Sequence, residues 1–232
     1  MHFYSKTEFW QPLFIVVGFP VFYMLYSASN IAQNLFDGNN LDYYIPFWGG
    51  IIILHWISVF CVAMNLKIRG LSFSDIGISL SNSRIKYFIS GYFVIAVAAV
   101  ITIEYLLTQI TIDPSLIQRL PGLIPITIEH RIFFIFLVFS TGVCEEIVYR
   151  GFAITSLSHN GVNKWLALII AAFLFVGIHG FYAYFNRFIF LFGGGIMFGV
   201  IYLVSRKLLP GMILHLAINL SSIFAILSIQ IE

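Results

Sequence analysis

Residues 132–152 read IFFIFLVFSTGVCEEIVYRGF, an apolar run that ends with two adjacent carboxylates and a guanidinium. The run has about the 20 residues that a helix needs to cross a bilayer. Its charged residues are Glu145, Glu146 and Arg150. A charged side chain at the centre of a bilayer costs about 2.5–3.5 kcal/mol on insertion scales. We therefore expect a membrane-spanning helix whose three charged residues have partners or a function.

The composition of the whole chain supports a membrane protein. Of its 232 residues, 60% are hydrophobic and only 9% are charged, whereas soluble domains have about 25% charged residues. The mean hydropathy is +0.96. The apolar runs are nearly continuous and lack the alternation of β-barrel strands, so the sequence predicts an all-α bundle of transmembrane helices. A net charge of +2 without a basic run gives no reason to expect a nucleic-acid partner.

The apolar runs predict about seven spans, with six to eight as the range. They cover residues 12–32, 45–66, 87–110, 132–152, 165–179, 188–204 and 208–229. We divide the chain into N-terminal transmembrane helices (residues 1–130) and a catalytic core (residues 131–232), which together form one integrated membrane domain. Glycines in the sixth span, at residues 193–195 and 199, are expected to permit close helix packing.

Basic residues in the links between spans predict the orientation. Eight of them fall on one side of the membrane: Lys6, Lys67, Arg69, Arg84, Lys86, Lys164, Arg206 and Lys207. Three fall on the other side: Arg119, Arg131 and Arg187. The positive-inside rule then predicts a cytoplasmic N-terminus. We expect an integral protein of the plasma membrane, with the basic links on the cytoplasmic side.

The charges of the fourth span separate by helix face. Glu146 and Arg150 are four residues apart, so they share a face and can form an ion pair. Glu145 is turned about 100° away and cannot share that partner equally. We predict that Glu146 and Arg150 are a structural pair and that Glu145 is a general base.

Two later spans carry polar residues that could join Glu145. Glu145 and His179 are each 17 residues from Val162, in a turn-like segment, so neighbouring helices can bring them to one depth. His215 and Asn219 share a face of the last span, where they could serve a site or bind a neighbouring helix by hydrogen bonds. Three other polar residues, His55, Glu104 and His130, have no spacing that ties them to a site, and we interpret them as structural.

These residues form three motifs in order: Glu145-Glu146-x-x-x-Arg150, Phe175-x-x-x-His179 and His215-x-x-x-Asn219. Over about residues 131–221 the chain resembles the CAAX-protease and bacteriocin-processing (CPBP, or Abi) family of intramembrane proteases. The resemblance implies hydrolysis of a peptide bond within a helical bundle.

The same resemblance assigns roles to the motif residues. Glu145 would activate the attacking water and His179 would help to hold it. His215 and Asn219 would stabilise the oxyanion, and Glu146 with Arg150 would position the site.

The resemblance also implies the partners and leaves alternatives open. The expected substrate is a peptide or protein, possibly associated with the lipid bilayer. We expect no cofactor, although the family has been described as metal-dependent and two histidines with a glutamate match some catalytic zinc sites. A non-catalytic scaffold or regulator on the same fold, acting in bacteriocin immunity or on a sensor kinase, is the second hypothesis.

Overall fold

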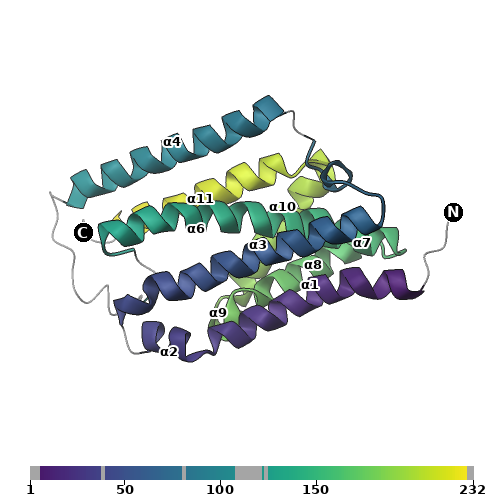
Figure 1. Ribbon diagram of the computed structural model, residues 1–232, viewed down its shortest axis with the longest axis horizontal. Helices are drawn as coiled ribbons and strands as arrows, with labels where there is room; N and C mark the ends of the chain where they lie inside the picture. Colours follow the sequence, from purple (N-terminus) through teal and green to yellow (C-terminus); the bar gives the residue numbers. More distant parts are fainter. Residues whose placement is uncertain (1–5, 38–39, 80–81, 108–121, 123–124, 229–232) are drawn as a thin grey trace.

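The computed structural model describes residues 6–37, 40–79, 82–107, 122 and 125–228, and all regular structure in these residues is helical. The long helices lie side by side, with α4 at one edge, α1 at the opposite edge, and α6 and α3 between them (Figure 1). The α-helices are α1 (Lys6–Ser27), α2 (Asn30–Phe36), α3 (Tyr44–Ile68), α4 (Asn82–Leu107), α6 (Ile128–Glu145), α7 (Ile154–His159), α8 (Lys164–Gly177), α9 (Gly180–Asn186), α10 (Phe188–Ser205) and α11 (Leu209–Ser228). Short 3-10 turns, η1 (Leu41–Tyr43) and η2 (Phe73–Ile76), and a π-helical segment, η3 (Glu146–Ala153), complete them. The predicted all-α bundle is therefore confirmed.

Every predicted span coincides with a helix, but fewer than seven are long enough to cross a membrane alone. Among the described residues four qualify: Leu41–Ile68, Ser83–Thr102, Ile128–His159 and Phe188–Ser205. A fifth is added if Gln11–Ser27 and Asn30–Phe36, bent by 57°, are one span. The helix α8 falls short because it has 14 residues and the chain breaks at Gly180, whose φ is +81°. These apolar helices make the chain an integral membrane protein.

The site helix is much longer than its predicted span. The continuous helical segment Ile128–His159 has 32 residues, or about 48 Å at 1.5 Å per residue. The hydrocarbon core of a bilayer is about 30 Å thick. This segment therefore extends beyond the membrane, and α7 forms its last turns.

Two of the predicted cytoplasmic links meet at one end of the bundle. The backbone N–H of Leu208, between α10 and α11, donates to the carbonyl of Gly77 at 3.1 Å. Gly77 ends η2 with a φ of +97°, a conformation that favours glycine. At the start of η2, the backbone N–H and hydroxyl of Ser72 donate to the carboxylate of Asp75, which lowers the pKa of Asp75. The link between α3 and α4 is thus a structured turn held against the start of α11.

Close packing of α8 on α10 depends on two of the glycines in α10. A Cβ added at Gly195 would lie 3.0 Å from Cβ of Ala172, and one at Gly199 would lie 2.8 Å from Cγ of Leu168. Nothing lies within 4 Å of a Cβ added at Gly193. The predicted role in close packing is confirmed for Gly195 and Gly199, while Gly193 faces open space.

This difference predicts opposite results for two alanine substitutions in one helix. Gly193→Ala should maintain or slightly raise stability, because alanine is the better helix former by about 0.8–1 kcal/mol. Gly195→Ala should lower the free energy of unfolding by about 1–3 kcal/mol relative to Gly193→Ala, because it overpacks the α8–α10 contact. Thermal unfolding of both variants in detergent measures the difference, and equal stability would contradict the assigned packing.

Candidate active site

The site begins where the regular α-helix of α6 ends. From Glu146 to Ala153 the helix is π-helical, and every residue of this segment is buried. Such segments are rare and are frequent at functional sites. Within it, Nη1 of Arg150 lies 3.4 Å from Oε1 of Glu146, so the ion pair expected from their spacing is present.

Aromatic rings from two other helices surround the guanidinium of Arg150. Its Cζ lies 4.0 Å from the ring centroid of Phe175 on α8 and 5.2 Å from that of Phe198 on α10. A cation over an aromatic face is stabilised by the quadrupole of the ring, more strongly when water is excluded. Arg150 is only 2% exposed. Its buried charge is therefore balanced by Glu146 and by the two rings, which connects η3 to α8 and α10.

His215 on α11 lies between the two adjacent carboxylates. Its Nδ1 is 3.2 Å from Oε1 of Glu146, and its Nε2 is 3.6 Å from Oε2 of Glu145. Because Glu146 is paired with Arg150 as a carboxylate and can only accept, Nδ1 of His215 must be the donor. Gly211, one turn earlier, permits this approach, since a Cβ there would lie 2.7 Å from Oε2 of Glu146. Glu146 therefore contacts the site directly through His215, in addition to its structural pairing.

Glu145 has a partner that the sequence did not reveal. Its Oε1 lies 3.0 Å from Nε2 of His55 on α3, and both side chains are buried. The spacing of the sequence gives His55 no tie to the site, whereas the structure places it in direct contact with Glu145. The two residues are 90 positions apart, and the sole sequence signal was a histidine alone within an apolar span.

The second oxygen of Glu145 has a different environment. Its Oε2 is buried and has no hydrogen-bond partner among the described residues. In the described part of the chain, Nε2 of His215 lies 3.6 Å from this oxygen. A buried carboxylate oxygen without a donor has a lone pair available to accept a proton, which a general base requires.

The remaining predicted site residues lie at the same cluster. His179 lies two residues after the end of α8, where its Nδ1 lies 3.0 Å from the carbonyl of Phe175, and it interacts electrostatically with Glu145. The Nδ2 of Asn219 donates to Oγ1 of Thr141 at 3.2 Å, one turn before Glu145 on α6. The structure thus gathers residues from α3, α6, η3, α8 and α11, although His179 is more exposed than the others.

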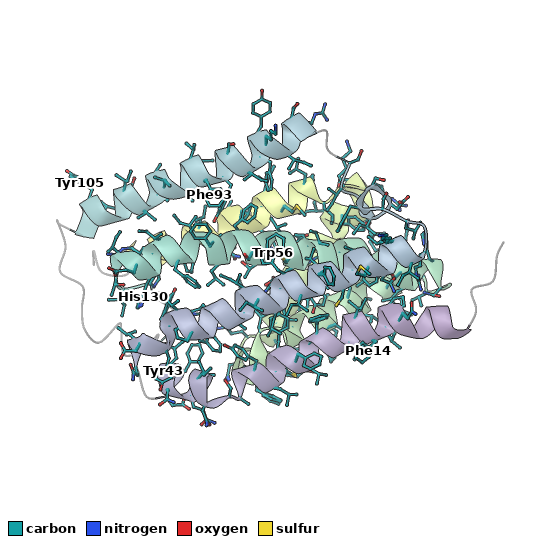
Figure 2. All side chains as sticks on the ribbon, in the orientation of Figure 1. Phe14, Tyr43, Trp56, Phe93, Tyr105 and His130 are labelled. Carbon is teal, nitrogen blue, oxygen red and sulfur yellow. The ribbon has the colours of Figure 1, made fainter. Side chains whose placement is uncertain are left out.

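Of the other two residues interpreted as structural, the structure describes the side chain of one, His130. His130 stacks on Tyr44, with 4.3 Å between ring centroids, and it lies at the end of α6 away from η3 (Figure 2). It has no contact with the candidate site. The side chain of Glu104 lies outside the described residues.

The side chains do not have the arrangement of a zinc site. In the part of the chain that the structure describes, no three or more His, Cys, Asp or Glu side chains are placed to hold a metal ion. Instead, Nε2 of His55 contacts Oε1 of Glu145 directly, and Nδ1 of His215 is directed to Glu146. The donors are therefore engaged with one another and do not converge on a common point.

The buried carboxylates and histidines lie within membrane-spanning helices, an arrangement that can support hydrolysis inside a membrane, and part of the chain matches a known family. Residues 127–221 match the family described as type II CAAX prenyl endopeptidase Rce1-like. The match confirms the resemblance to CPBP intramembrane proteases over this region, and at family level it supports a CAAX-type intramembrane protease. Comparison with curated proteins and with solved structures finds no significant match. The matched region contains every predicted motif residue and excludes α3 with His55.

The Glu146–Arg150 pair predicts a large stability effect that a second substitution reduces. Arg150→Met leaves the buried Glu146 carboxylate without its cation, which should cost about 3–5 kcal/mol of unfolding free energy. The double variant Glu146→Gln/Arg150→Met should lose clearly less unfolding free energy than Arg150→Met, because neither charge remains. Thermal and denaturant unfolding in detergent test this comparison. Equal losses in the single and double variants would show that the charge of Glu146 is balanced elsewhere.

Proposed function

We propose that the protein is an intramembrane endopeptidase in which Glu145 activates the attacking water. One observation supports this most directly: Oε2 of Glu145 is buried, lacks a hydrogen-bond partner among the described residues, and lies 3.6 Å from His215. A base and a donor are thus adjacent within a helical bundle. Together they provide the two functions that acyl transfer to water needs.

The proposed reaction follows from these positions. Glu145 takes a proton from water as the water oxygen bonds to the carbonyl carbon of the scissile peptide. The electron pair of the carbonyl moves to its oxygen, and His215 and Asn219 stabilise that oxyanion by donating hydrogen bonds. Glu145 then gives its proton to the leaving nitrogen as the C–N bond breaks. His179 is proposed to hold the water before attack.

The proposed donor role of His215 requires a proton on each of its ring nitrogens. Because Nδ1 donates to Glu146, a hydrogen bond from Nε2 to an oxyanion needs a second proton on the ring. The ring lies 3.6 Å from Glu145 and 3.2 Å from Glu146. Glu146 and Arg150 are therefore proposed to position His215.

The surroundings of the site suggest which substrates can reach it. We propose a peptide or protein substrate that approaches from the membrane or its surface. The cation-rich links predict that the N-terminus and the opening of the site face the cytoplasm, in the plasma membrane.

The proposal predicts a selective effect of removing the base. Glu145→Gln should lower the rate of cleavage at least about 10²–10⁴-fold, because an amide cannot accept the proton. Purified wild type and variant, incubated in detergent with a peptide library, provide the measurement. Glu129→Gln is the matched control, since it alters an exposed carboxylate at the far end of α6 and should cleave normally.

Two outcomes would overturn this assignment. Full cleavage by Glu145→Gln would show that another group is the base. A wild-type protein that cleaves nothing, and whose interaction with a signalling or immunity partner survives Glu145→Gln, would establish the scaffold alternative.

The donor arrangement also predicts resistance to chelation. We propose a metal-free mechanism, so extended treatment with a strong zinc chelator, followed by metal analysis, should leave the cleavage rate unchanged. Loss of activity that returns on adding zinc would instead favour the metallopeptidase alternative.

A further inference from the structure

His55 on α3 contacts Glu145 directly and lies outside the region matched by the family. It is 3% exposed, and its ring contacts two oxygens. Nδ1 lies 2.8 Å from the carbonyl oxygen of Ile51, and Nε2 lies 3.0 Å from Oε1 of Glu145. The backbone of His55 is held as well, because the hydroxyl of Ser58 donates to its carbonyl.

These two contacts determine where protons must lie. A backbone carbonyl can only accept, so Nδ1 of His55 carries a proton. A neutral imidazole has a single N–H, which would leave Nε2 with a lone pair directed at a carboxylate oxygen. Two acceptors at 3.0 Å do not form a hydrogen bond. One further proton must therefore lie between Nε2 and Glu145.

The charge of the cluster indicates where that proton resides. Two carboxylates, Glu145 and Glu146, are buried side by side, and an uncompensated buried charge is costly. Arg150 balances Glu146 at 3.4 Å. His215 lies 3.6 Å from Oε2 of Glu145, whereas His55 lies 3.0 Å from Oε1. A doubly protonated His55 would balance Glu145 through this shorter contact, as a charge-assisted hydrogen bond.

We infer that His55 is a positioning residue that, as an imidazolium, holds Oε1 of Glu145 and directs Oε2 toward the attacking water. This inference rests on the proposed role of Glu145 as the base. Holding one oxygen fixes the rotation of the carboxylate and keeps it ionised before attack. When Oε2 takes the proton of the water, the imidazolium remains on Oε1, and the resting state returns once that proton leaves with the amine.

The inference makes the N-terminal helices part of the active site. Tyr23 on α1 packs edge-on against His55, with 5.1 Å between ring centroids. The helices α1 and α3 therefore form the wall behind Glu145. We propose that the two parts of the chain act as one functional unit.

A pair of substitutions tests the positioning role through cleavage kinetics. His55→Leu should lower kcat about 10–100-fold, the range seen when a partner that orients a functional ligand is removed. KM should change little, because His55 does not face the substrate. His55→Gln should retain clearly more of kcat than His55→Leu, because the glutamine amide can still donate to Oε1.

Trp56→Phe is the matched control on the same helix. Trp56 lies midway along α3 (Figure 2) and is 44% exposed, and its indole N–H donates to the hydroxyl of Ser140 on α6 at 3.1 Å. The substitution removes a polar α3–α6 contact without touching Glu145, so kcat should stay near the wild-type value. Equal kcat in His55→Leu and wild type, or equal losses in His55→Leu and Trp56→Phe, would overturn the positioning role.

A second measurement does not depend on protease activity. Nitrogen NMR of ¹⁵N-histidine-labelled protein in detergent reports the protons on each ring, and His55→Gln identifies the signals of His55. We expect two protonated ring nitrogens in wild type and one in Glu145→Gln. A singly protonated His55 in wild type would overturn the inference. If His55 shows two protonated ring nitrogens but the wild-type protein cleaves no peptide, the shared proton is supported and the proposed function is rejected.

Discussion

The structure depends on neutralising two adjacent carboxylates in an apolar bundle. Glu145 and Glu146 are consecutive, so they leave the helix in different directions, and Arg150 pairs with Glu146. Glu146 finds Arg150 on its own helix, whereas Glu145 must find His55 on another. His215 lies between both. Charge interactions therefore join α3, α6, η3 and α11 in addition to packing. A uniformly apolar bundle would have the packing alone.

The sequence predicted the features that depend on local spacing. Apolar runs located the helices, and the interval of four residues predicted the Glu146–Arg150 pair. The predicted span count was too high, because apolar length does not show where a helix breaks, as at Gly180. The π-helical segment was also missed, since no residue type marks it. His55 was missed because a contact across 90 residues has no signature in the spacing of either helix.

The match to a protease family and the geometry of the cluster support each other on different grounds. The family match locates the motifs along residues 127–221. The structure adds which atoms meet: Oε1 of Glu145 is engaged by His55, while Oε2 has no hydrogen-bond partner within the described residues. That asymmetry between two chemically equal oxygens is what distinguishes a candidate base from an ordinary buried ion pair.

The length of the helix that carries Glu145 also determines how water can reach a site in a membrane protein. The segment Ile128–His159 exceeds the hydrocarbon core by about 18 Å. Glu145 is 14 residues from its end, or about 21 Å. If the overhang lies on the side of the basic links, as the positive-inside rule predicts, Glu145 would lie only a few ångströms inside the apolar layer. The hydration shell of the lipid headgroups is then a nearby source of the hydrolytic water, and a channel across the bilayer is unnecessary.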